Sequence, residues 1–265
     1  MDFLNINQKT FFIAGVANKK SVAYFTARTL IDNHAKCLFS VQNEAQIEAV
    51  KKLFPDSPVF VCDVENKIHL KNLEGEIKKH ADKLDGFLQS LAFANFSEGV
   101  KPFVETKRED FLQAAQISCF SLVEVAQSLK ELFTPEASIV TISISNTRAT
   151  SYGYLGPIKA MLDATVPFLA KSFSEFSKVR VNAIGAGPLK TSASAGIPDY
   201  IDNYLYAEEL TLRKQALQTQ EVANTVCFLL SPASSGINAS TVLVDAGMSS
   251  NYFDQGVVKT FSKNK

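Results

Sequence analysis

Two side chains able to act on a developing charge stand seven positions apart, Tyr152 and Lys159. On an α-helix seven residues make nearly two turns, so this spacing predicts that both side chains share one helix face. A phenol with an ammonium nearby can donate a hydrogen bond to an oxyanion that forms in a reaction. The alternative is a surface tyrosine at a helix start and a solvated lysine, because such pairs also arise by chance. The surrounding elements must therefore decide between these interpretations.

A candidate anion site lies in the segment GVANKKSVAY, which begins at Gly15. We expect a strand to end near Gly15 and a helix to start near Ser21. Free N–H groups and the dipole at a helix N-terminus favour a pyrophosphate, and Gly15 permits a sharp turn. The usual GxGxxG spacing is absent, and such turns also occur in α/β folds that bind no dinucleotide.

Polar or small residues follow the next three expected strands. Gln42-Asn43-Glu44 lies where a Rossmann fold meets the adenosine ribose. No Arg or Lys follows directly, and a 2′-phosphate needs positive charge, so this edge favours NADH over NADPH. Asp63 is expected to place a carboxylate near the adenine amino group. The small residues around Ser90 let a cofactor lie against the backbone.

The elements that position these residues alternate along the chain. Short apolar runs predict strands at Thr10–Val16, Lys36–Val41, Pro58–Val64, Gly86–Ala92, Ser138–Ile144, Val179–Ile184 and Thr241–Val244. Helical segments lie near residues 21–33, 44–54, 66–81, 107–133, 157–176 and 219–230. This order predicts an α/β, doubly wound Rossmann fold with a seven-stranded parallel sheet and helices on both faces.

One segment interrupts the alternation, from Pro188 to about Leu217. We expect residues 1–265 to form a single dinucleotide-binding domain in which residues 188–217 make a substrate lid. The alternative is a simple surface excursion.

Composition argues against several other classes of protein. Lys+Arg 27 balance Asp+Glu 27, which argues against a duplex-DNA binder and gives no support to a charged membrane surface. The sequence shows no secretory signal and no apolar stretch long enough to span a membrane, so a cytoplasmic protein is expected. Four cysteines stand without a CxxC or a Cys/His cluster, which predicts reduced thiols and no metal site.

Six strings in the same order resemble the NADH-dependent enoyl-acyl-carrier-protein reductases, a divergent branch of the short-chain dehydrogenases. They are the phosphate turn, VQN, CDV, QSLAFA, the Tyr-x6-Lys pair and VRVNAIGAGPLKTSASAGI, and TVLVDAG near residue 241 adds to them. Ordinary short-chain dehydrogenases use Tyr-x3-Lys, which would require a tyrosine four residues before Lys159. This chain has Leu155 at that position. The resemblance implies reduction of the trans-2-enoyl double bond of acyl-carrier-protein thioesters in type II fatty acid synthesis.

The resemblance also assigns roles. Tyr152 would hydrogen-bond the thioester carbonyl, and Lys159 would bind the nicotinamide ribose. The expected cofactor-binding residues are Gly15, Ser21, Val22, Gln42, Asp63, Val64, Ser90, Leu91, Ile142, Lys159, Ile184, Pro188, Leu189 and Thr191. Short-chain dehydrogenases pair their long apolar helices, so the two helices near 107–133 and 157–176 predict a homotetramer.

The sequence departs from the family at the substrate pocket. Ile144 stands where the family has a second tyrosine, and Ala92 replaces a glycine. Ser143 or Ser145 could supply a hydroxyl, although strand alternation puts both on the face opposite Ile144. Two alternatives therefore stay open: a short-chain dehydrogenase that reduces another carbonyl or enone, and an inactive homologue that binds the cofactor.

Overall fold

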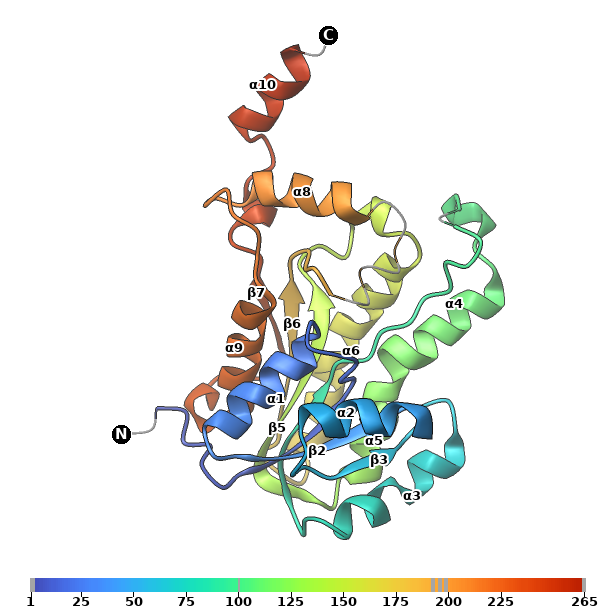
Figure 1. The fold of residues 1–265 in the computed structure, drawn as a ribbon, viewed down its shortest axis with the longest axis vertical. Helices are drawn as coiled ribbons and strands as arrows, with labels where there is room; N and C mark the ends of the chain where they lie inside the picture. Colours follow the sequence, from blue (N-terminus) through green and yellow to red (C-terminus); the bar gives the residue numbers. More distant parts are fainter. Residues whose placement is uncertain (1–2, 100, 192–193, 195–196, 198–199, 264–265) are drawn as a thin grey trace.

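One parallel sheet runs through the computed structural model, which describes residues 3–99, 101–191, 194, 197 and 200–263 (Figure 1). Its strands are β1 (Thr10–Ala14), β2 (Lys36–Val41), β3 (Val59–Val61), β4 (Leu84–Gln89), β5 (Phe133–Ile144), β6 (Arg180–Ala186) and β7 (Ser240–Val244). They lie in the order β3-β2-β1-β4-β5-β6-β7. The predicted doubly wound, seven-stranded sheet is confirmed, and its direction of winding reverses between β1 and β4.

Helices cover both faces of this sheet, as predicted. The α-helices are α1 (Val22–Asp32), α2 (Ile47–Leu53), α3 (Lys67–Lys78), α4 (Arg108–Ala115), α5 (Ser121–Leu129), α6 (Leu155–Ser174), α8 (Tyr200–Leu210), α9 (Thr219–Leu230) and α10 (Gln255–Lys263). Shorter helical turns are η1 (Glu44–Gln46), η2 (Phe103–Glu105), the π-helical η3 (Gln116–Phe120), η4 (Thr150–Tyr152), η5 (Pro232–Ser234) and η6 (Met248–Ser250).

Alternation along the strands divides the core into two clusters. Phe12 and Phe87 point to the face covered by α3, α5 and α6. Phe11 and Phe39 point to the face covered by α1 and α9. Because both faces are covered, the sequences of the strands are continuous apolar runs and do not alternate between apolar and polar residues.

Several predicted boundaries were wrong. β5 begins at Phe133 rather than Ser138, so the helix expected over 107–133 ends earlier and contains the π-helical turn η3. β3 and β4 end sooner than expected, at Val61 and Gln89. Asp63 and Ser90 therefore lie in the loops just beyond the strands.

Two helices had no counterpart in the sequence prediction. α8 forms within the segment 188–217 and lies beyond the arrowheads of the central strands (Figure 1). α10 follows the last strand and extends away from the sheet at the C-terminal end of the chain (Figure 1).

The described residues add three observations on composition. Within them no helix is long and apolar enough to cross a membrane. They contain no cluster of three His, Cys, Asp or Glu side chains that could hold a metal ion. Cys37, Cys62, Cys119 and Cys227 are buried and free, as predicted.

Candidate active site

Tyr152 does not lie on the helix that carries Lys159. It ends the short turn η4, Gly153 follows with φ +60°, and α6 begins at Leu155. The prediction of one shared helix face was therefore wrong, because a left-handed glycine separates the two residues. What holds Tyr152 near the edge of the sheet is the turn between β5 and α6.

Lys159 lies in the second turn of α6, and its side chain is almost fully buried, at 4% exposure. Its Nζ donates to the carbonyl oxygen of Ile142 on β5 at 2.7 Å. Burial lowers the pKa of Lys159 to about 8, and the nearby Asp163 carboxylate opposes that shift. The alternative of a solvated lysine is wrong.

The Tyr152 side chain is half-buried at the end of η4, in the turn between β5 and α6. Burial raises its pKa to about 12, and the nearby phenol of Tyr200 raises it further in the same direction. The group therefore keeps its proton at neutral pH, as a hydrogen-bond donor must. Its hydroxyl has no hydrogen-bond partner within the described part of the chain.

Asp163 stands one helical turn beyond Lys159 on the same side of α6. Burial raises the pKa of its carboxyl, while the hydroxyls of Ser143 and Thr241 lower it. The Thr241 hydroxyl donates to Asp163 at 3.3 Å. The Ser143 hydroxyl lies near Asp163 but is buried without a hydrogen bond of good geometry. Ser143 thus belongs to the surroundings of Lys159, and sequence analysis missed Asp163 despite its helical spacing.

The predicted anion turn lies at the point where the winding of the sheet reverses. Gly15 has φ +107°, and a Cβ there would come 2.2 Å from the carbonyl oxygen of Ser90. The backbone continues the pairing of β1 and β4 at this point, since Ser90 N–H donates to Ala14 at 2.9 Å. Only glycine fits so close an approach. In parallel α/β folds ligands bind in the crevice at such a reversal.

Ser21 caps α1, so the helix starts near this residue as expected. Its hydroxyl accepts from the Tyr24 N–H at 3.1 Å and donates to the Asn18 carbonyl at 2.9 Å. Val22, the first residue of the helix, is buried against the sheet. The helix N-terminus therefore follows the turn at Gly15 by a short loop, and its positive dipole end is of the kind that favours a phosphate.

The residues predicted to meet the adenosine lie at the carboxyl ends of β2, β3 and β4. Gln42 is exposed, and Asp63 accepts from the Glu65 N–H at 3.0 Å while its side chain stays half-buried. Val64 is buried and Leu91 half-buried. All four lie at the carboxyl edge of the sheet.

The residues predicted to meet the nicotinamide follow β5 and β6. Ile142 holds Lys159 through its carbonyl, and Ile184 is fully buried in β6. Pro188 and Leu189 leave the end of that strand. Thr191 begins a compact turn in which its N–H donates to the Ser194 hydroxyl at 2.9 Å.

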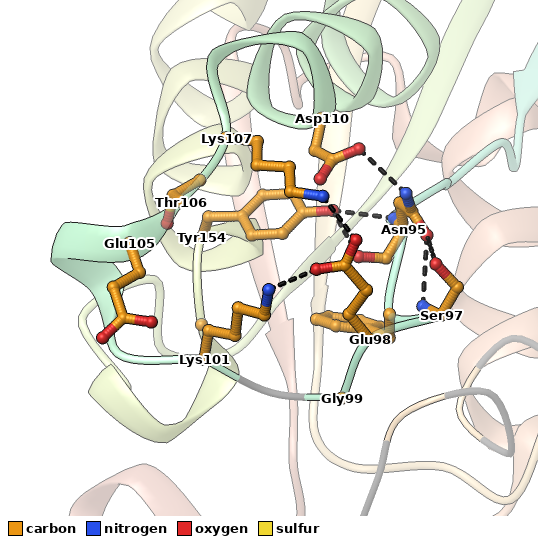
Figure 2. Close-up of a pocket in the computed structure, with 12 residues that line it drawn as sticks. Asn95, Ser97, Glu98, Gly99, Lys101, Glu105, Thr106, Lys107, Asp110 and Tyr154 are labelled. Atoms are coloured by element: carbon orange, nitrogen blue, oxygen red, sulfur yellow. Dashed lines mark hydrogen bonds and ion pairs between the residues drawn. The ribbon is translucent and has the colours of Figure 1, made fainter.

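A polar pocket between the loop after β4 and the start of α6 escaped the sequence analysis (Figure 2). The Tyr154 hydroxyl accepts from the Asn95 N–H at 2.7 Å and donates to the Asn95 carbonyl at 3.2 Å. The Asn95 amide donates to Asp110 at 2.9 Å. Glu98 pairs with both Lys101 and Lys107 across the mouth of the pocket. The loop after β4 is thereby tied to the start of α6, and no local sequence signal announces contacts between such distant segments.

The fold and these residues define a dinucleotide-binding oxidoreductase of the short-chain dehydrogenase type. The family described as enoyl-(acyl carrier protein) reductase matches residues 15–249, and the chain belongs to this family.

Relatives with assigned activities are similar over nearly the whole chain. An NADPH enoyl-[acyl-carrier-protein] reductase of Staphylococcus aureus is 34% identical, covering 92% of this chain and 98% of its own. An NADH enzyme of that name from Enterococcus faecalis has the same identity and coverage.

Solved structures of such enzymes share the fold. The Bacillus cereus enzyme with NADP+ and an indole naphthyridinone has a TM-score of 0.87 at 33% identity, over 91% of this chain and 96% of its own. The enzyme from Anaplasma phagocytophilum in complex with NAD has a TM-score of 0.87 at 28% identity, over 92% and 95%.

Proposed function

We propose that this protein reduces the trans-2 double bond of acyl thioesters held on acyl carrier protein, with NADH as reductant, in fatty acid synthesis. The observation that carries this proposal is the joint placement of a neutral Tyr152 phenol and a buried Lys159 ammonium at the carboxyl edge of the sheet. Relatives that bear the name of this activity support it.

The loops at the reversal of the sheet suit a dinucleotide. Gly15 leaves its backbone bare at the reversal of the sheet, where a Cβ would collide with Ser90. Ser21 and the first N–H groups of α1 would hold the pyrophosphate. The Gln42–Glu44 edge offers hydrogen bonds and a negative charge but no guanidinium for a 2′-phosphate. NADPH relatives exist in the family, so this edge is what favours NADH here.

Lys159 and Tyr152 have separate roles in the proposed reaction. NADH supplies a hydride when bound. Lys159 would bind the nicotinamide ribose and orient the ring. Tyr152 would donate to the thioester oxygen, which gains charge when the hydride reaches the β-carbon, and the α-carbon then takes a proton from solvent. A fixed donor in a site withdrawn from water stabilises that charge without reorganising.

The proposal also includes a substrate lid, a homotetrameric assembly and a cytoplasmic location. Residues 188–217 carry α8 over the carboxyl edge, which suits a substrate lid in a single domain (Figure 1). Exposed apolar side chains on α4, η3 and α6 suit a homotetramer. The four buried, free thiols suit the reducing cytoplasm.

A second candidate is a short-chain dehydrogenase for another carbonyl or enone. The observation in its favour is Ile144, half-buried at the end of β5, which gives the substrate pocket no hydroxyl at that position. Reduction of an enoyl thioester then depends on hydrogen-bond donors at other positions of the pocket.

An NADH oxidation assay separates these candidates. The purified protein is given a crotonyl thioester beside an acetoacetyl thioester, first with NADH and then with NADPH. The proposal expects oxidation with the crotonyl thioester and lower KM for NADH than for NADPH. Turnover of the acetoacetyl thioester alone would favour the second candidate, and equal or better use of NADPH would overturn the cofactor assignment.

A further inference from the structure

The turn that carries Tyr152 ends on a glycine. Within the turn, the Tyr152 N–H donates to the Ala149 carbonyl at 3.0 Å, and the Gly153 N–H donates to the Thr150 carbonyl at 3.3 Å. Gly153 then takes φ +60°, and a Cβ on it would have one described neighbour within 4 Å, a ring carbon of Phe96 at 3.9 Å. Because glycine is conformationally permissive, the place of Tyr152 depends on what holds the residue beyond this glycine.

That residue, Tyr154, is held by contacts with distant parts of the chain. It immediately precedes α6, and its side chain is 8% exposed. Its hydroxyl accepts from the Asn95 N–H at 2.7 Å and donates to the Asn95 carbonyl at 3.2 Å. Burial raises the pKa of Tyr154, so the hydroxyl keeps the proton that the second bond requires. The ring centroids of Phe96 and Phe111 lie 5.8 and 6.4 Å from that of Tyr154, so both the ring and the hydroxyl are fixed.

The loop that binds this phenol is itself tied to α4. The Asn95 side-chain amide donates to the Asp110 carboxylate at 2.9 Å, and its oxygen accepts from the N–H and the hydroxyl of Ser97 at 3.1 and 2.7 Å. Figure 2 shows the Tyr154 hydroxyl and the Asp110 carboxylate reaching Asn95 from different helices. We call Tyr154, Asn95 and Asp110 the Asn95 clamp. It joins the loop after β4, α4 and the start of α6.

Lys159 has an anchor of its own. Its Nζ donates to the Ile142 carbonyl on β5 at 2.7 Å, and this bond does not involve the Tyr154 hydroxyl. The apolar side of α6, from Ile158 to Phe173, is buried in the core. Loss of the Tyr154 hydroxyl should therefore displace the turn before α6 and leave Lys159 in place.

We infer that Tyr154 is a positioning residue whose two hydrogen bonds to Asn95 hold the Tyr152 phenol in place for the substrate oxygen. The inference rests on the proposed function for the identity of that oxygen, the thioester carbonyl. Tyr154 itself is assigned no contact with substrate, because its proton and one lone pair are already bonded to Asn95. The clamp thereby makes turnover depend on the placement of the loop after β4.

The first test is Tyr154→Phe, which removes the hydroxyl and keeps the ring. Tyr206→Phe is the control, because Tyr206 is 49% exposed and has no assigned role. With crotonyl thioester and NADH, Tyr154→Phe should lower kcat at least about tenfold, since a small displacement of a catalytic group is costly. The KM for NADH should stay unchanged, and the control should match wild type. A wild-type kcat in Tyr154→Phe would overturn the inference.

A double-mutant comparison separates positioning from general stabilisation of the fold. In protein that already carries Tyr152→Phe, adding Tyr154→Phe should leave the residual kcat unchanged, because the phenol that it positions is gone. An equal fractional loss of kcat with and without the Tyr152 hydroxyl would contradict the inference.

A second variant approaches the clamp from its other side and serves if Tyr154→Phe does not fold. Asn95→Ala removes the bond to Asp110 and keeps the backbone groups that bind Tyr154. It should lower kcat by a smaller factor, and again only in protein that retains the Tyr152 hydroxyl. A loss of the same size in the Tyr152→Phe background would count against the clamp.

A readout without turnover keeps the inference separable from the proposed function. In protein labelled with ¹³C at tyrosine Cζ, the Tyr152 resonance is identified by its absence in Tyr152→Phe. Tyr154→Phe should shift this resonance, and Tyr206→Phe should leave it unchanged. Wild-type protein that reduces no crotonyl thioester would refute the proposed function alone, and the labelled samples would then decide whether the clamp positions Tyr152. A Tyr152 resonance that does not move in Tyr154→Phe would refute the clamp.

Discussion

Burial acts on the two central side chains in opposite chemical directions. It raises the pKa of Tyr152, which makes the phenol harder to ionise, and it lowers the pKa of Lys159, which makes the ammonium easier to neutralise. The Tyr152 phenol therefore keeps its proton over a wide pH range, whereas the Lys159 ammonium loses its proton near pH 8. Two consequences at the scale of single residues can be measured.

Replacing Tyr152 by Phe removes the donor and leaves the packing almost unchanged. Because the donor acts only as charge develops, turnover should fall on the order of 10²–10³-fold with little change in NADH affinity. Steady-state kinetics and NADH fluorescence titration measure the two effects. Tyr252→Phe is the control, since Tyr252 is 81% exposed. Near-normal turnover in Tyr152→Phe would show that this phenol is not the donor.

The affinity for NADH should depend on pH through Lys159. The pKa of this lysine is lowered to about 8, so raising the pH through that value removes the charge proposed to bind the ribose. The Kd for NADH should therefore increase above about pH 8 in wild type. Lys159→Ala should bind NADH more weakly and show no such rise. A wild-type Kd that stays constant from pH 7 to pH 10 would contradict this role.

Residue identities were easier to predict than their geometry. The Tyr-x6-Lys pair was found from spacing, but the reason was wrong, because Gly153 turns the chain between them. Asp163 follows from the same helical spacing and was overlooked. Tyr200 carries no local signal, because Leu189, whose N–H donates to its hydroxyl, meets it only in the folded chain.

At the scale of elements, the end of β1 and the loop after β4 approach each other closely where the winding of the sheet reverses. Apolar runs predicted the seven strands because both faces of the sheet are covered. Their ends were less predictable, since β5 extends back to Phe133 and the helix before it holds a π-helical turn. Such boundaries depend on pairing between strands, which periodicity within one segment does not report.

Gly15→Ala tests the crevice directly. A methyl group there would lie 2.2 Å from the Ser90 carbonyl at φ +107°, so either the turn or β4 must shift. We expect a loss of more than about 1 kcal/mol in the free energy of unfolding and a clear loss of NADH affinity. Thermal unfolding and NADH titration measure these. Gly236→Ala is the control, because nothing lies within 4 Å of a Cβ at that position. Normal NADH binding in Gly15→Ala would contradict the crevice as the cofactor site.

At the scale of the whole molecule, two surfaces suit contacts between copies. One carries the exposed side chains of Leu112, Phe120, Met161 and Phe168 on α4, η3 and α6, and the other is the edge strand β7 with Leu243 exposed. Two distinct two-fold contacts are what a dihedral tetramer requires.

Light scattering at micromolar concentration should therefore give the mass of a tetramer. Phe168→Glu should reduce that mass, because it places a charge in an apolar contact. Ile68→Glu on α3 is the control, an apolar side chain that is 67% exposed and belongs to neither of these two surfaces. A wild-type mass equal to that of the 29.0 kDa chain would refute the tetramer.

The most direct test of the account follows the hydride itself. NADH deuterated at the transferred position of the nicotinamide is incubated with crotonyl thioester and the protein, and the thioester product is analysed by mass spectrometry and NMR. The account predicts a butyryl thioester with one deuterium on its β-carbon, formed by wild type and strongly reduced in Tyr152→Phe. Recovery of unreacted crotonyl thioester, with NADH shown to be bound, would contradict the proposed reaction, as would deuterium delivered to the carbonyl carbon.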